Sequence, residues 1–71
     1  MNYYQDDNFF YKVEGNKVTT VCTLDFALRI EIFENEFMAE EILSYRKITA
    51  HEFNHAAAQV LQVLNEKIFN K

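Results

Sequence analysis

The sequence lacks proline and tryptophan, and it has only one glycine, Gly15, and one cysteine, Cys22. A single cysteine rules out a disulfide within the chain, and it favours a reducing compartment. Without proline or glycine runs there is no sign of a long linker between domains. We therefore expect one small domain over residues 1–71, near the lower size limit for independent folding. Such a domain needs dense apolar packing, a metal or association to be stable.

Basic residues are also scarce, with seven Lys and Arg against eleven Asp and Glu and a formal net charge of −4. Binding to nucleic acid depends on basic residues that displace counterions, so this balance argues against direct nucleic-acid binding and against adsorption to an anionic membrane. No apolar stretch approaches the roughly 20 residues that span a bilayer. No secretory signal is visible, so we expect a cytoplasmic protein. Hydrophobic residues make up 49% of the chain, which is typical of a folded domain rather than a disordered one.

The one glycine lies where a β-hairpin would turn. Side chains of residues 9–14 and 17–23 alternate between a more apolar and a more polar face, as in β-strands. Gly15-Asn16 between them suits a two-residue type II′ turn. This turn sets a register that pairs Glu14 with Lys17, Val13 with Val18, Tyr11 with Thr20 and Phe9 with Cys22. One face of the hairpin then carries Phe9, Tyr11, Val13, Val18, Thr20 and Cys22. This face is the better candidate for the core, and Cys22 on it is interpreted as an inert buried thiol.

Apolar and polar residues continue to alternate after the hairpin, and this pattern predicts a third strand over residues 26–33. A helix beginning at Asp25 is the alternative, because Leu24, Leu28 and Ile32 also fit a helical spacing. For residues 34–45 we expect a short helix capped by Asn35. The overlapping segment of residues 31–41 holds five acids without a base, namely Glu31, Glu34, Glu36, Glu40 and Glu41. They are a candidate docking surface for a basic protein partner, and the alternative is a solvated face that keeps the domain soluble.

A capping signal in the sequence indicates where a C-terminal helix over residues 50–69 begins. Thr49 and Glu52 have the spacing of a capping box, in which each side chain bonds the backbone N–H of the other residue. An apolar stripe follows at helical spacing, consisting of Phe53, Ala57, Val60, Leu61, Leu64 and Ile68. We expect this stripe to pack on the apolar face of the sheet. Apolar surface left over there, or an exposed sheet edge, would serve a homodimer.

The segment His51-Glu52-Phe53-Asn54-His55 resembles the active-site helix of zinc metallopeptidases. The resemblance implies that His51 and His55 bind zinc and that Glu52 acts as general base. Two observations argue against this role. At about 100° per residue both histidines fall about 150° from the centre of the apolar stripe and face solvent. The family also needs a third protein ligand, and Glu66, the only acid after His55, lies three turns further along the same helix.

These observations predict an α+β fold with a three-stranded antiparallel sheet covered by one C-terminal helix, and a short helix between them. The expected function is that of a small non-enzymatic module that binds a protein partner or itself, without a cofactor and without catalytic residues. An acidic inhibitor that imitates nucleic acid and binds a basic protein is the first alternative. The second is a zinc-dependent peptidase, and His51 and His55 are also candidates for a surface metal pair without catalysis.

Overall fold

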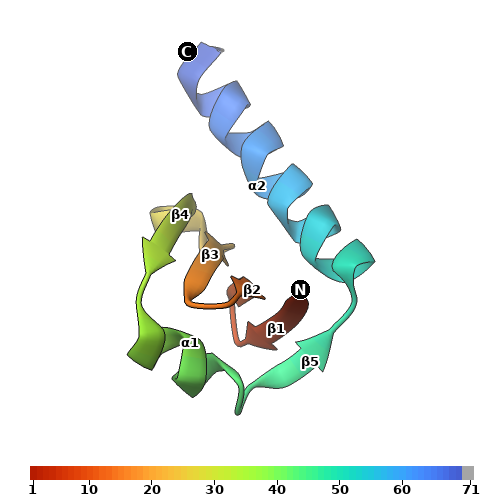
Figure 1. Cartoon of the computed structure of the whole chain (residues 1–71). Helices are drawn as coiled ribbons and strands as arrows, with labels where there is room; N and C mark the ends of the chain where they lie inside the picture. Colours follow the sequence, from red (N-terminus) through yellow and green to blue (C-terminus); the bar gives the residue numbers. More distant parts are fainter. Residues whose placement is uncertain (70–71) are drawn as a thin grey trace.

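Five strands form one antiparallel sheet in the computed structural model, which describes residues 1–69. The sheet has the order β4-β3-β2-β1-β5, and two α-helices pack against it (Figure 1). The elements in chain order are β1 (Asn2–Asp6), β2 (Phe9–Glu14), β3 (Lys17–Cys22), the 3-10 turn η1 (Asp25–Ala27), β4 (Arg29–Glu34), α1 (Glu36–Ile42), β5 (Arg46–Ile48) and α2 (Ala50–Phe69). The α+β class is thus confirmed, whereas the expected number of three strands is wrong.

The two strands that the sequence analysis missed are β1 and β5. A two-residue turn at Asp7-Asn8 joins β1 to β2, and Asp7 adopts a φ of 51°, a left-handed conformation that Asp tolerates better than most residues. The dipeptide Asp7-Asn8 between two aromatic pairs is a turn signal that could have revealed β1. By contrast, β5 has only three residues, and it pairs with β1, where Tyr3 lies opposite Ile48. No local pattern predicts a pairing over that distance.

The central hairpin of β2 and β3 agrees with its prediction. The register pairs Glu14 with Lys17, Val13 with Val18, Tyr11 with Thr20 and Phe9 with Cys22. Gly15 has a φ of 61° and Asn16 does not share this positive φ, as a type II′ turn requires. Local turn chemistry therefore determines this part of the sheet.

The third predicted strand begins later than expected. It is β4, and it begins at Arg29 because the preceding residues turn through η1, where the N–H of Ala27 donates to the carbonyl of Leu24 at 2.9 Å. The alternative of a helix from Asp25 is therefore realised only as this single turn. The short helix predicted within residues 34–45 is α1. Its cap is confirmed, since Oδ1 of Asn35 accepts a hydrogen bond from the N–H of Met38 at 3.0 Å.

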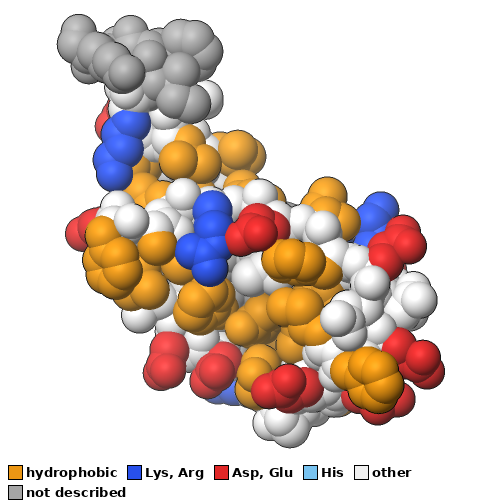
Figure 2. Space-filling model, turned by 90° about the vertical axis from the view of Figure 1, so that its left-hand side faces the viewer, with side chains coloured by type: hydrophobic (Ala, Val, Ile, Leu, Met, Phe, Trp, Pro, Cys, Tyr) orange, Lys and Arg blue, Asp and Glu red, His pale blue; other side chains and the backbone are white. Residues whose placement is uncertain are grey.

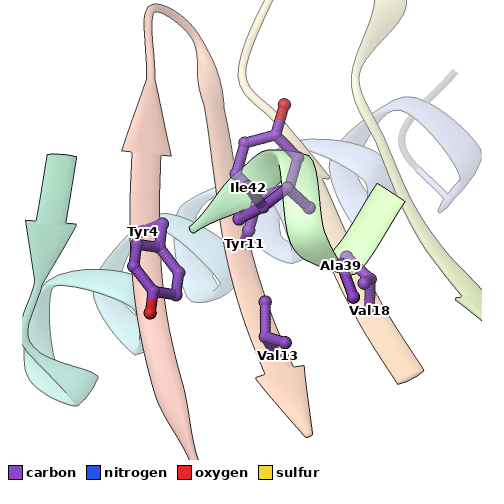
Figure 3. Packing of buried hydrophobic residues seen from close by; sticks show 6 residues of the cluster. All are labelled: Tyr4, Tyr11, Val13, Val18, Ala39 and Ile42. Atoms are coloured by element: carbon purple, nitrogen blue, oxygen red, sulfur yellow. The ribbon is translucent and has the colours of Figure 1, made fainter. Parts of the chain in front are cut away.

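The helices cover opposite faces of the sheet. Figure 3 shows α1 in front of the sheet, over the face that was expected to be the core, with α2 behind. The cluster on the α1 side contains Tyr4, Tyr11, Val13, Val18, Ala39 and Ile42. Phe53 and Val60 of α2 pack instead on the other face, together with Val21 and Ile48. The expectation that the long helix would cover the first face is therefore wrong.

The face of the sheet that packs against α2 carries a row of apolar side chains that crosses the strands. Within the hairpin alone this face looked polar, because only Phe10 and Val21 are apolar on it. The neighbouring strands extend the row with Tyr3 of β1, Ile30 of β4 and Ile48 of β5. The rings of Tyr3 and Phe53 lie 5.5 Å apart between centroids. Burial of this row is what fixes α2 on the sheet.

Most of the predicted stripe of α2 contacts the sheet. Phe53 and Val60 are buried, Ala57 and Leu64 are half-buried, and Leu61 remains 51% exposed. The side chain of Ile68, the last member of the stripe, lies outside the described residues.

Among the helices of residues 1–69, none has the length and apolar character that a membrane crossing requires.

Candidate protein-binding surface

The outward side of α1 combines an exposed aromatic ring with carboxylates. The helix buries Ala39 and Ile42 against the sheet, and Phe37 on its opposite side is 82% exposed. Glu40 and Glu41 follow Phe37 by three and four residues, so the three side chains are neighbours on the helix surface. Figure 2 shows acidic side chains around exposed hydrophobic groups in the lower part of the molecule, where α1 lies. Exposure of a single phenylalanine does not define a binding site, since Phe26 in η1 is 88% exposed as well; Phe37 differs because carboxylates of its own helix lie beside it.

The carboxylates of α1 have no basic neighbour on their own helix, whose sequence contains Glu36, Glu40 and Glu41 but neither Lys nor Arg. Within residues 1–69 the only ion pair joins Arg29 and Glu31. Of the five acids singled out in the sequence, Glu31 thus has a basic partner on β4. Glu34, at the end of β4, lies opposite Lys17 in the β3–β4 register. The structure therefore leaves the three acids of α1 as the part of this segment with uncompensated charge.

A shallow groove runs between α1 and the β2–β3 turn. Its lining includes Glu36, Glu40 and Leu43 from α1 and the residue after it, and Gly15 and Asn16 from the turn. Leu43 is 57% exposed. A groove lined by two carboxylates and an apolar residue suits a lysine or arginine side chain, whose methylene groups pack while its charged end is neutralised.

Tyrosine packing holds α1 and the following loop on the sheet. The rings of Tyr11 and Tyr45 are 5.5 Å apart, and the hydroxyl of Tyr45 lies 3.5 Å from Oε1 of Glu41. Burial, together with the neighbouring Tyr45, Asp6 and Glu41, raises the pKa of Tyr11 to about 12. Burial and Glu41 also raise the pKa of Tyr45. Both phenols are therefore neutral at physiological pH, and they serve as packing groups beneath the surface of α1.

The segment that resembles a zinc-peptidase helix lies at the start of α2, with both histidines exposed. The N–H of Glu52 donates to Oγ1 of Thr49 at 3.1 Å, and the N–H of Thr49 donates to Oε1 of Glu52 at 3.3 Å. This confirms the capping box and shows that the glutamate has a structural role. His55 lines a shallow groove with Glu52 and Gln59, and His51 does not reach it. No group of three potential metal ligands occurs in the described part of the chain.

Comparisons with family models, with curated proteins and with solved structures found no match to this chain. Evidence for function therefore comes from the surface of the chain itself.

The sequence analysis missed the two apolar residues on the outward side of α1 and its C-terminal end, Phe37 and Leu43. A helical wheel of residues 36–42 would have placed Phe37 opposite the buried side chains of Ala39 and Ile42. Cys22 is fully buried on the sheet, in agreement with its interpretation as an inert thiol.

Proposed function

We propose that this protein is a small non-enzymatic module that binds a protein partner through α1. The docking surface consists of Glu36, Phe37, Glu40, Glu41 and Leu43, and we call it the α1 surface. The observation that carries this proposal is the 82% exposure of Phe37 on a helix with three unpaired acids. A partner that fits is a basic segment with at least one apolar side chain. Its charges neutralise the acids while its apolar group covers Phe37.

The energetics of this surface favour a reversible complex. Full burial of Phe37 and Leu43 contributes about 1.5–3 kcal/mol for each side chain, and part of this offsets the entropy lost on association. The glutamates act at longer range and accelerate encounter with a basic partner. Because these charges are exposed, salt screens them, and the association rate should fall as ionic strength rises.

Titration with a short peptide of alternating lysine and leucine tests this proposal, with backbone amide shifts measured by NMR. We expect the shifts to concentrate in residues 36–43 and binding to weaken in salt. The triple variant Glu36→Gln, Glu40→Gln, Glu41→Gln should bind at least about tenfold more weakly. The control variant Asp7→Asn, Glu14→Gln, Glu66→Gln removes the same charge from exposed positions elsewhere and should bind normally. Equal losses in the two triple variants would contradict a localised docking surface.

The same unpaired acids favour one other function, that of an acidic inhibitor that occupies the nucleic-acid groove of a basic protein. In that case charge alone carries binding, and the aromatic ring of α1 contributes nothing. The variant Phe37→Ala separates the two functions. It should weaken binding of the lysine-leucine peptide several-fold if the α1 surface is a mixed apolar and acidic site. An unchanged affinity, with strong salt dependence, would instead favour the inhibitor.

A further inference from the structure

The two edges of the sheet differ in how they are protected. One edge is β5, which has three residues and carries Arg46 and Lys47. Short edge strands with basic side chains resist pairing with other strands. The opposite edge is β4, with six residues and neither lysine nor proline. Ile32 on this strand is 63% exposed and Phe33 is 37% exposed. Only the β4 edge therefore has the length and apolar character that favour the addition of another strand.

Peptide groups on β4 are available for such an addition. The N–H of Asn35 donates to the carbonyl of Asn16 at 2.9 Å, which marks this pair as hydrogen-bonded. Hydrogen-bonded pairs alternate along an antiparallel ladder, so Arg29, Glu31 and Phe33 also bond toward β3. The residues between them, Ile30, Ile32 and Glu34, direct their N–H and C=O groups away from the sheet. The β4 edge is thus a template for a new antiparallel ladder.

The long helix also extends past this edge. It begins beside β5, crosses the other strands and projects beyond β4 (Figure 1). Twenty residues of helix span about 30 Å, whereas the four spacings between β5 and β4 span about 19 Å. Leu64 and Ile30 pack against the same cluster, so the turns after Leu64 reach beyond the last strand. A strand added to β4 would lie beneath this projecting end of α2.

We propose that β4 pairs antiparallel with β4 of a second copy, which joins two five-stranded sheets into one. A second copy fits this edge because a two-fold pairing uses the unprotected edge of both chains at once. The protected β5 strands then become the two outer edges, and growth stops at a dimer. Figure 2 looks toward the β4 side, where hydrophobic side chains occupy much of the middle of the molecule.

One register makes this pairing complementary. It places Ile30 opposite Ile32 of the second copy, and both positions have outward peptide groups. On the same side of the sheet as α2, four isoleucines then form one apolar cluster. On the other side Arg29 lies opposite Phe33 of the second copy, a favourable cation–π pair. Arg29 already lies 5.8 Å above the ring of Phe9 within its own chain.

The least favourable contact in this register is that of Glu31 with its own symmetry mate. Each of these carboxylates, however, keeps its ion pair with Arg29 of its own chain. The Arg29 side chains of both copies are also diagonal neighbours of the opposing Glu31, so the four charges cancel. The dimer does not depend on the α1 surface, so failure of one proposal leaves the other intact.

Molar mass measured by light scattering and sedimentation tests the dimer, on the 71-residue chain from about 1 μM to about 1 mM. We expect a concentration-dependent dimer. The variant Ile32→Lys should raise its dissociation constant at least about tenfold, since Ile32 would face Ile30 at the interface. Leu43→Lys introduces the same charge at the exposed residue that follows α1 and should leave the dimer unchanged. Circular dichroism melts establish that each variant is folded. A monomer throughout this range, or equal dimers of wild type and Ile32→Lys, would overturn the proposal.

Cysteine substitution tests the register separately. Glu31→Cys places two thiols opposite each other in a non-hydrogen-bonded pair, at the short separation that suits a disulfide. We expect mild oxidation to convert it to a covalent dimer. Ile32→Cys should not cross-link in this way, because Ile32 faces Ile30 rather than itself. Cys22 is fully buried and is common to both variants. Cross-linking of Ile32→Cys without Glu31→Cys would refute the register and with it the complementarity on which the pairing rests.

Discussion

Raising the pH through the range of tyrosine ionisation should destabilise this protein because of Tyr11. Its pKa is about 12 in the folded chain, against the ordinary tyrosine pKa of 10.0 that applies once the chain unfolds. Above pH 10 the unfolded chain loses the proton first, so the free energy of unfolding falls as the pH rises toward 12. The two-unit difference corresponds to a loss of about 2 kcal/mol between pH 9 and pH 12. The stability that Tyr11 contributes is thus fully present below pH 10.

Urea unfolding at pH 9 and at pH 12 measures this loss, and the variant Tyr11→Phe is its control. Phenylalanine keeps the ring that packs against Tyr45 but cannot ionise, so the pH-dependent loss should be about 2 kcal/mol smaller in the variant. All other ionisable groups are common to the two proteins, so their contributions largely cancel in the comparison. The pKa of Tyr45 is also raised, so part of the alkaline loss should persist in the variant. Identical pH dependence of the two proteins would refute the assignment of the loss to Tyr11.

Two further substitutions have opposite expected effects on thermal and urea stability. Thr49→Ala removes the Oγ1 that accepts the N–H of Glu52, and it should lower the free energy of unfolding by about 1 kcal/mol; an unchanged melting curve would show that the capping box is dispensable. Thr20→Val should raise it by up to about 1 kcal/mol, because Oγ1 of Thr20 is buried in the described structure without a hydrogen-bond partner. A destabilised Thr20→Val would mean that this hydroxyl is satisfied in solution.

Local chemistry explains the parts of the fold that the sequence predicted. Gly15 permits the positive φ of the hairpin turn, and the register of β2 and β3 follows from it. Asn35 caps α1, and Thr49 with Glu52 starts α2. In each case the interacting groups are separated by only a few residues, so the residue types and their spacing suffice. The acids of α1 are exposed, and their role as a docking surface stays a prediction.

What the sequence did not determine depends on contacts between distant parts of the chain. The pairing of Tyr3 with Ile48 creates an edge strand that no local pattern indicates. It also completes the apolar row that places α2 on the face that looked polar in the hairpin alone. The sequence by itself thus determined the turns, the caps and the separate amphipathic elements. Only the tertiary structure decided which face each helix covers and that β4 is the unprotected edge. These outcomes depend on which surfaces compete for burial, and that competition exists only once the chain is assembled.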